Sequence, residues 1–356
     1  MAHETTPEAL LARVLRETGD PALRQVWADA LLERGDPRGE AIALQVAAGG
    51  QPLNAAQDKR ARSILSKHAV EWLGPLAGIL MHKKGLVFDR GLLKACHVQV
   101  KSVPALEAAV GHPLWSAVER MWFCDRFAWD PRIVPLLVHP VMRSLRELIG
   151  VGMNTVFPRL AAHTSPLPHT TIQLVDDGFR GGDVEVLRAA RSDYRDALPV
   201  LRRLGVATYD AAVEWVFRLP VVQRMQELSL TCETKVDAAL LARAERLEAL
   251  QAFELRPHFF VNQGEFRAHL VLRFTRDAAG KFSRVHLSVS GFRGSFAPRL
   301  DLPISNPRKL GSNSVDFEPE LAGLKAAALT RIEVKLDQVP QALARFKRAE
   351  IIVLSP

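Results

Sequence analysis

Cysteine is scarce in this sequence, and its three residues are widely separated. Cys96, Cys124 and Cys232 are odd in number and share no short spacing, which argues against a disulfide framework or a zinc cluster and suits a reducing compartment. No apolar run approaches the roughly 20 residues that a membrane-spanning helix needs. The stretch from Met1 to Glu8 is polar, unlike a signal peptide. We therefore expect a cytoplasmic protein with no membrane partner.

The strings that mark common catalytic and cofactor sites are also missing. The sequence contains no GxxxxGK[ST], HExxH, CxxC or GxSxG string. The segment from Asp176 to Asp183 is acidic but lacks the ligand spacing and final glutamate of a calcium loop. We expect no catalytic residue, no metal and no small-molecule cofactor, hence a non-enzymatic role. A catalytic site assembled from residues distant in sequence stays open as an alternative.

What is abundant is core material and positive charge. The 48% hydrophobic and 24% charged content is that of a folded protein rather than a disordered one. The net charge is +8, and residues 265–309 hold nine Lys or Arg against three Asp or Glu. A basic stretch of this kind is suited to nucleic acid or to an acidic protein.

Three helix starts share one pattern, in which a capping side chain precedes a proline. Thr6-Pro7, Asp20-Pro21 and Asp36-Pro37 each place an oxygen acceptor before a residue whose missing N–H costs nothing in the first turn. Apolar residues at helical spacing follow each start. The pattern predicts helices from Pro7, over 21–34 and over 37–48, with a fourth over 55–72. Together they form a small helical module over residues 1–75.

Part of this module resembles a known family. The run from Leu23 to Gln45, with the string ERGDPRGE from Glu33 to Glu40, is similar to the repeat-companion domain, a short module placed ahead of repeats in myxobacterial and planctomycete proteins. Trp27 stands where the family pattern has tyrosine, and Ala30 stands where it has tryptophan. The match covers about 40 of 356 residues. The resemblance implies that repeats follow, and it implies no catalytic role.

Four acidic residues in this run invite a second interpretation. Asp29, Glu33, Asp36 and Glu40 lie close together in sequence, but no His or Cys accompanies them to complete a usual metal set. We favour a helix cap for Asp36 and solvated positions for Glu33 and Glu40.

A short motif of apolar, two residues, apolar, one residue, apolar recurs through the middle of the chain. It starts seven times at intervals of 22 to 32 residues, over 93–98, 118–123, 145–150, 169–174, 201–206, 225–230 and 247–252. Leucine-rich repeats have periods of roughly 20–29 residues. Short apolar segments at helical spacing separate the motifs, as a strand-and-return unit requires. The pattern predicts an α/β fold with a leucine-rich-repeat-like solenoid over 76–260. A doubly wound α/β sheet stays open, since only Asn154 is near the usual asparagine position.

The last third, 261–356, changes to a period of two. Alternation from Phe266 to Phe274, the turn around Gly280 and a second alternation from Arg284 predict a β-hairpin with one buried and one wet face. A loop is expected over 291–320. Strand, helix and strand then follow over 330–336, 340–348 and 350–354, as a unit that caps the repeats.

The sequence yields two sets of candidate contact residues. Positions between the inward residues of the motifs would face a protein partner on the concave side: His97, Trp122, Ile149, Gln173, Gly205, Ser229 and Gln251. Trp122 is the strongest anchor candidate, although a ring buried in the array is the competing interpretation. The main hypothesis is a scaffold or adaptor for a protein partner.

The wet face of the hairpin forms the second set. It gathers Arg267, His269, Arg273, Arg284 and His286, next to Arg293 in the following loop. Such a cluster binds phosphates, so nucleic acid or another polyanion is the alternative partner. An exposed sheet face that keeps charge for solubility explains the same residues, and we favour that interpretation.

Overall fold

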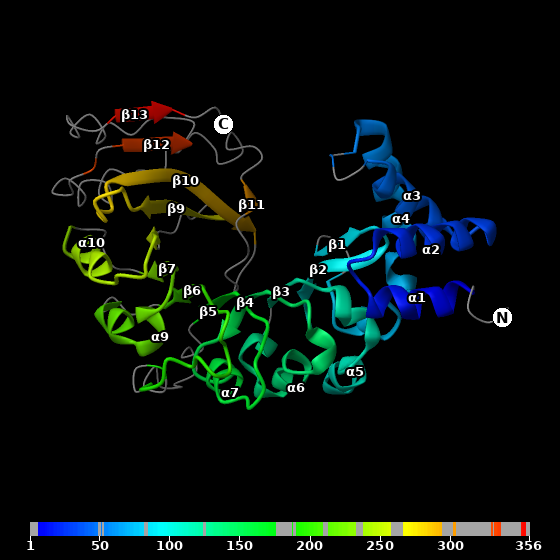
Figure 1. The fold of residues 1–356 in the computed structure, drawn as a ribbon, viewed down its shortest axis with the longest axis horizontal. Coiled ribbons are helices and arrows are strands. Elements are labelled where there is room, and N and C mark those ends of the chain that lie inside the picture. Colours follow the sequence, from blue (N-terminus) through cyan, green and yellow to red (C-terminus); the bar gives the residue numbers. More distant parts are fainter. Residues whose placement is uncertain are drawn as a thin grey trace. The chain divides into compact units, whose positions relative to one another are not determined.

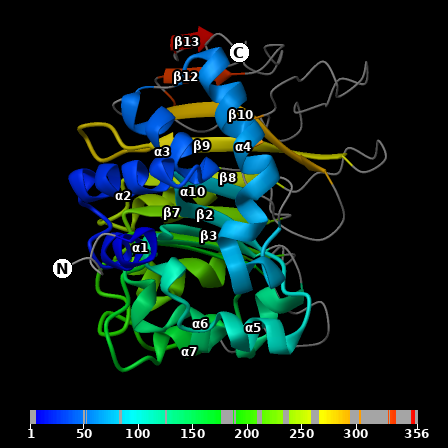
Figure 2. The same cartoon turned by 90° about the vertical axis from the view of Figure 1, so that its right-hand side faces the viewer.

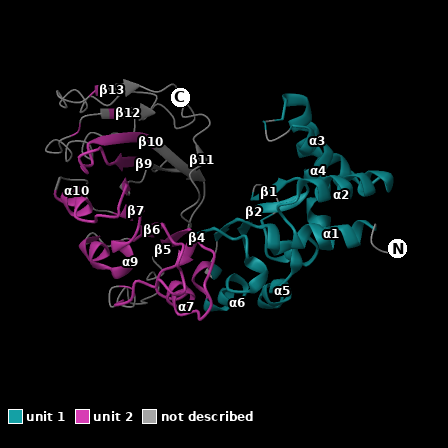
Figure 3. Cartoon of the chain, in the orientation of Figure 1, with its two compact units in different colours: residues 1–127, 131–148 teal, residues 128–130, 149–356 magenta. Residues whose placement is uncertain are grey.

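The protein is described from a computed structural model that covers residues 6–48, 51, 53–81, 85–123, 126–175, 187, 190–208, 213–232, 238–257, 266–293, 302–303, 329, 331–335 and 350–353. The chain divides into two compact units (Figure 3). Unit 1 comprises Met1–Phe127 and Pro131–Leu148, and unit 2 comprises Ala128–Asp130 and Ile149–Pro356. The fold is mixed α/β, as the sequence predicts. The three-part division at residues 75 and 260 stays a prediction.

Unit 1 opens with four helices at the positions that the sequence analysis predicted. They are α1 (Pro7–Arg16), α2 (Pro21–Glu33), α3 (Pro37–Ala47) and α4 (Ala55–Leu73). The caps form as the sequence indicates: Thr6 Oγ1 accepts from Ala9 N at 3.2 Å, and Asp36 Oδ1 accepts from Arg38 N at 2.8 Å. A buried cluster that includes Val14, Trp27 and Ile42 extends to Leu92. The helices therefore pack on the strands that follow.

A β-hairpin that the sequence analysis did not predict joins the module to the strands. β1 (Leu86–Asp89) pairs antiparallel with β2 (Leu92–Val98), with Asp89 opposite Leu92. The two residues between them, Arg90 and Gly91, have φ of 48° and 75°, as a type I′ turn requires. In the sequence, Gly91 between two apolar runs was the signal that could have predicted this turn.

Parallel pairing begins at β2 in unit 1. β3 (Arg120–Phe123) pairs with it so that Cys96 lies opposite Met121 and Val98 opposite Phe123. These four side chains are at most 2% exposed. The return segments are α5 (Val103–Ala109), a 3₁₀ helix over Pro113–Ala117 and α6 (Val134–Leu137). The first two predicted motifs thus form neighbouring strands, which confirms their register.

Unit 2 continues the alternation. β4 (Glu147–Gly152) contains the boundary between the units, because the long segment of unit 2 begins at Ile149. Parallel pairing then joins four strands: β5 (Thr171–Val175), β6 (Arg203–Ala207), β7 (Glu227–Cys232) and β8 (Ala252–Pro257). Described return helices are α7 (Phe157–Ala161), α9 (Pro220–Gln223) and α10 (Ala238–Glu245), and Figure 1 shows them on one side of the strands. Two inward rows form the core, for example Leu204, Leu228 and Phe253, each at most 1% exposed.

The last predicted motif has the wrong register. We expected Leu250 and Ala252 to point inward with Gln251 between them. Leu250 and Ala252 are both buried, but β8 begins only at Ala252. Phe253 and Leu255 lie opposite the inward Leu228 and Leu230, and Glu254 lies opposite Ser229, so the motif was placed three residues too early. Gln251 precedes the strand and is exposed, while its backbone N–H donates to Gln226 O at 2.7 Å. The stronger apolar pair at Phe253 and Leu255 determines which face is buried.

The predicted hairpin is present in unit 2. β9 (Phe266–Thr275) pairs antiparallel with β8 and with β10 (Arg284–Arg293). β12 (Arg331–Lys335) and β13 (Glu350–Val353) add in parallel, as Figure 2 shows in side view. β10 extends to Arg293 and pairs with β11 (Leu302–Pro303), so the expected loop begins later than Gly291. The predicted helix over 340–348 lies outside the described residues.

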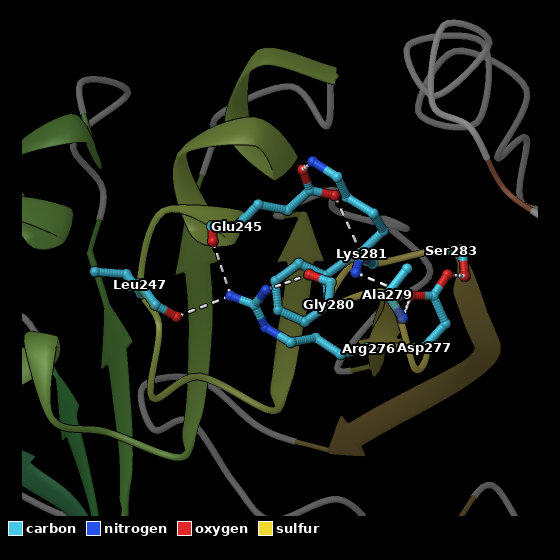
Figure 4. A network of polar contacts seen from close by, with 9 residues as sticks. Glu245, Leu247, Arg276, Asp277, Ala279, Gly280, Lys281 and Ser283 are labelled. Atoms are coloured by element: carbon cyan, nitrogen blue, oxygen red, sulfur yellow. Dashed lines mark hydrogen bonds and ion pairs between the residues drawn. The ribbon is translucent and has the colours of Figure 1, made fainter.

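Two arginines of unit 2 each donate hydrogen bonds to several backbone carbonyl oxygens in the segments between strands. The Arg224 guanidinium donates to the carbonyl oxygens of Asp193, Leu198 and Leu201 at 2.9 to 3.1 Å. Arg276 donates to the carbonyl oxygens of Glu245 and Leu247 at 2.9 and 2.8 Å and to that of Gly280 (Figure 4). It also donates to the carbonyl oxygen of Leu250. Its guanidinium also stacks 4.7 Å from the Phe282 ring. These carbonyls lie in turns without ladder partners, and an arginine fork satisfies several of them at once.

Candidate functional site

The parallel strands of unit 2 align one outward residue from each strand into a row. Pairing places Gln173 beside Gly205, Gly205 beside Ser229 and Ser229 beside Glu254. The row continues through Arg273 on β9 and His286 on β10. Among the described helices of unit 2, none lies over this face of β5–β8 (Figure 1). The predicted contacts Gln173, Gly205 and Ser229 therefore share one face.

Gly205 allows its neighbour to lie flat on this face. A Cβ at position 205 would come within 2.9 Å of Gln173 Cγ. The Gln173 side chain thus occupies the space above the glycine. A larger residue at position 205 would displace it.

Two members of this row, Glu254 and Arg273, also belong to a network of ion pairs on the same face. We call this network the charged strip: Arg203, Glu227, Glu254, Arg256 and Arg273. Arg203 and Arg273 bind the two oxygens of Glu227 at 2.9 and 2.8 Å. Arg256 binds Glu254 at 2.6 Å, and Arg273 approaches the same carboxylate at 3.6 Å. Ser229 Oγ donates to Glu254 at 3.0 Å. Four strands, β6 to β9, contribute to the strip.

Glu254 is the most enclosed acid of the strip, with a side chain only 14% exposed. Burial by itself would raise the pKa of this carboxyl group. The charge and hydrogen bond of Arg256, the Ser229 hydroxyl and Arg273 outweigh burial and lower its pKa below the usual value. Glu254 is therefore held as a carboxylate at neutral pH.

The sequence analysis identified Ser229 and Arg273 from this region but missed the two glutamates between them. Glu227 occupies an outward position of a predicted strand, and Glu254 lies on β8, whose register was predicted wrongly. Nothing in the sequence around either residue distinguishes it from a solvated surface residue. Only pairing between β7, β8 and β9 brings Glu254 and Arg273 together across 19 residues of sequence. The alternation of outward residues was the only available signal.

The two predicted partner contacts of unit 1 pack against each other. His97 lies opposite Trp122 in the register of β2 and β3, and their ring centroids are 4.9 Å apart. Trp122 is 7% exposed, and the Arg120 guanidinium lies 5.6 Å from its ring. A Cβ at Gly85 would come within 2.6 Å of His97 Cβ. Of the two interpretations of Trp122, the structure therefore agrees with the one in which its ring is buried. Ile149, another predicted contact, is half-buried within β4.

The predicted polyanion cluster is only partly described. Arg273 belongs to the charged strip, where two carboxylates compensate its charge. His286 lies opposite Arg273 and is half-buried, whereas Arg284 is exposed. The side chains of Arg267, His269 and Arg293 lie outside the described residues. The described members therefore do not form a purely positive surface.

The acidic residues of the helical module have structural partners. Asp29 Oδ1 accepts from Gln25 at 2.8 Å, Asp36 caps α3, and Glu40 binds Arg60 through two hydrogen bonds of 2.6 and 2.7 Å. In the part of the chain that the structure describes, no group of three or more His, Cys, Asp or Glu side chains is placed to hold a metal ion. No described helix is long and apolar enough to cross a membrane.

Comparisons with known proteins add no relative. No protein-family model matches the chain, and neither the curated proteins nor the solved structures contain a match. The argument about function therefore rests on the residues and contacts described above.

Proposed function

We propose that this protein is a non-enzymatic scaffold or adaptor whose charged strip binds an acidic segment of a protein partner. In this proposal the strands of unit 2 belong to a leucine-rich-repeat-like solenoid, preceded by a repeat-companion module, in a cytoplasmic protein. The observation that carries it is the strip itself: charged residues from four neighbouring strands lie on a face that no described helix of unit 2 covers.

The charge balance of the strip favours an acidic ligand. Three guanidinium groups face two carboxylates, which leaves one positive charge in excess. The Arg203 and Arg273 side chains are 58% and 39% exposed, so a partner's carboxylates can reach both. Arg284 on β10, which is exposed, adds a further positive charge. Complementary charge of this kind guides association and determines the orientation of the partner.

A protein is favoured over a nucleic acid because negative charge is built into the strip. Glu227 lies within hydrogen-bond distance of Arg203 and Arg273, and Glu254 within that of Arg256. A run of phosphates along this face would approach both carboxylates. A polypeptide avoids this repulsion, because it can place carboxylates beside the arginines and amides or hydroxyls beside the glutamates.

Selection from a random peptide display library on the full-length protein tests the proposal. We expect enrichment of peptides rich in Asp and Glu, and at least about a tenfold loss of their affinity in Arg203→Glu, which corresponds to about 1.4 kcal/mol. Arg62→Glu is the matched control, because Arg62 on α4 is 77% exposed and is paired with Asp58 of the same helix.

Two outcomes contradict the proposal. Selected peptides that bind Arg203→Glu as well as the wild type would place their site elsewhere. Binding of single-stranded DNA or heparin in preference to every selected peptide, with affinity that falls steeply with salt, would assign the polyanion function instead.

A further inference from the structure

One side chain of the helical module pairs with the backbone of β1 as a neighbouring strand would. The Gln45 carboxamide on α3 donates from Nε2 to Phe88 O at 3.1 Å, and its Oε1 accepts from Arg90 N at 2.5 Å. The two backbone groups belong to residues two apart in sequence. That is the spacing at which one edge of a strand presents a carbonyl and an N–H to the next strand.

The register of the hairpin shows that these groups face away from β2. Asp89 and Leu92 flank the two-residue turn as the closing pair, so their backbone groups point toward each other. Phe88 therefore directs its backbone groups to the opposite side, which we call the β1 edge. β1 is also the terminal strand of its sheet. An uncovered edge of this kind is a template for strand addition, and Val87 beside it is apolar and 45% exposed.

Arg38 holds the module against the same hairpin. Its Nε and Nη2 donate to Gly91 O at 3.1 and 2.7 Å, and its guanidinium lies 4.8 Å from the Trp27 ring and 5.4 Å from the Trp72 ring. The contact is close, since a Cβ at Gly91 would come within 2.6 Å of Ile42 Cδ1. Burial lowers the pKa of Arg38 to about 10, and Asp36 opposes that shift. Arg38 thus remains charged at neutral pH.

We propose that the helical module is the N-terminal cap of the sheet and that Gln45 closes the β1 edge against a second copy of this chain. Two uncovered β1 edges are complementary to each other, because antiparallel pairing of identical strands around a twofold axis satisfies both. Terminal units of repeat arrays need such closure to remain soluble. The inference is independent of the charged strip and of its ligand.

The test compares full-length wild type, Gln45→Ala and the double variant Gln45→Ala/Arg38→Lys. Lysine keeps the positive charge but cannot form the forked contact with Gly91 O. We expect the Arg90 amide to exchange with deuterium about fivefold faster in Gln45→Ala, the value of one typical hydrogen bond. In light scattering coupled to size-exclusion chromatography, both variants should show a concentration-dependent rise in mass that the wild type lacks.

Gln25→Ala is the matched control, since Gln25 lies on the exposed side of α2 and binds Asp29. It should leave both exchange and mass at wild-type values. Unchanged exchange at Arg90 in Gln45→Ala would overturn the proposal. Faster exchange with an unchanged mass in both variants would also overturn it. That result would mean that the exposed β1 edge does not bind a second copy, so that Gln45 has no such binding to prevent.

Discussion

The guanidinium of Arg273 on β9 lies 2.8 Å from the carboxylate of Glu227 on β7, across the intervening strand β8. The same guanidinium approaches Glu254 on β8 at 3.6 Å. Arg273 thus connects the antiparallel hairpin to the last two parallel strands through side chains as well as through the backbone ladder. The charged residues on this face therefore interact across strands, although they lie far apart in the sequence.

Removing Arg273 should destabilise unit 2. In Arg273→Ala, Glu227 retains Arg203 and Glu254 retains Arg256, so the loss is that of one shared, partly exposed partner. We expect the free energy of unfolding to fall by about 1 kcal/mol in urea titrations. Arg284→Ala, which alters an exposed residue of the neighbouring strand, should change it by less than about 0.5 kcal/mol. Equal effects of the two substitutions on the free energy of unfolding would show that the ion pairs of Arg273 do not stabilise unit 2.

Glu254 should contribute to the loss of stability in acid. Its folded-state pKa lies below the usual 4.5, so the unfolded state takes up the proton first as pH falls. The stabilisation is therefore complete above about pH 4.5 and is lost as pH falls through the folded-state pKa. Glu254→Gln should be less stable than wild type at pH 7, and that difference should narrow toward pH 3 in thermal melts. A difference that is constant from pH 7 to pH 3 would show that the charge of Glu254 plays no part.

Gly39 should tolerate no side chain. A Cβ at this position would lie 2.7 Å from Leu32 N and 2.9 Å from Ala28 O, both backbone atoms of α2. Gly39→Ala should therefore force α2 and α3 apart and lower the free energy of unfolding by about 1–3 kcal/mol. Gly19→Ala is the control, since nothing lies within 4 Å of its Cβ; it should be neutral or stabilising by up to about 1 kcal/mol. Chemical denaturation of both variants measures the contrast.

Arg276 should be important for the connection between β8 and the hairpin. Arg276→Lys retains the charge, but a lysine cannot donate to the carbonyls of Glu245, Leu247 and Leu250 together. We expect a loss of about 2 kcal/mol, together with faster deuterium exchange over 247–251. Arg246→Ala alters an exposed neighbour and should leave both quantities unchanged. A variant Arg276→Lys that exchanges like wild type would contradict this role.

Local signals were sufficient for much of the fold. The caps at Thr6, Asp20 and Asp36 predicted three helices to within about one residue, because capping is decided by a few neighbouring atoms. The apolar motif located β2 to β7 for a similar reason, because the spacing of buried residues depends on neighbours within one strand. It failed at Gln251, where a weak motif overlapped the stronger pair at Phe253 and Leu255.

The candidate site was less accessible to such reasoning. Ser229 and Arg273 were identified as outward residues, but the sequence contains no sign that Glu227 and Glu254 lie between arginines from other strands. The same holds for Gln45 and Arg38, whose partners are backbone atoms 43 to 53 residues away. Periodicity specifies which face of a strand is buried but not which strand lies beside it.

By itself the sequence determined the helical module, the alternation of strand and helix, and the change to a hairpin after residue 265, because each depends on residues within one turn or one strand of each other. Only the tertiary structure decided that Arg38 and Gln45 hold α3 against the hairpin of β1 and β2, and that the charge of Arg273 is compensated by glutamates. Both outcomes depend on pairing between distant segments. Burial and charge compensation are properties of that pairing rather than of any single segment.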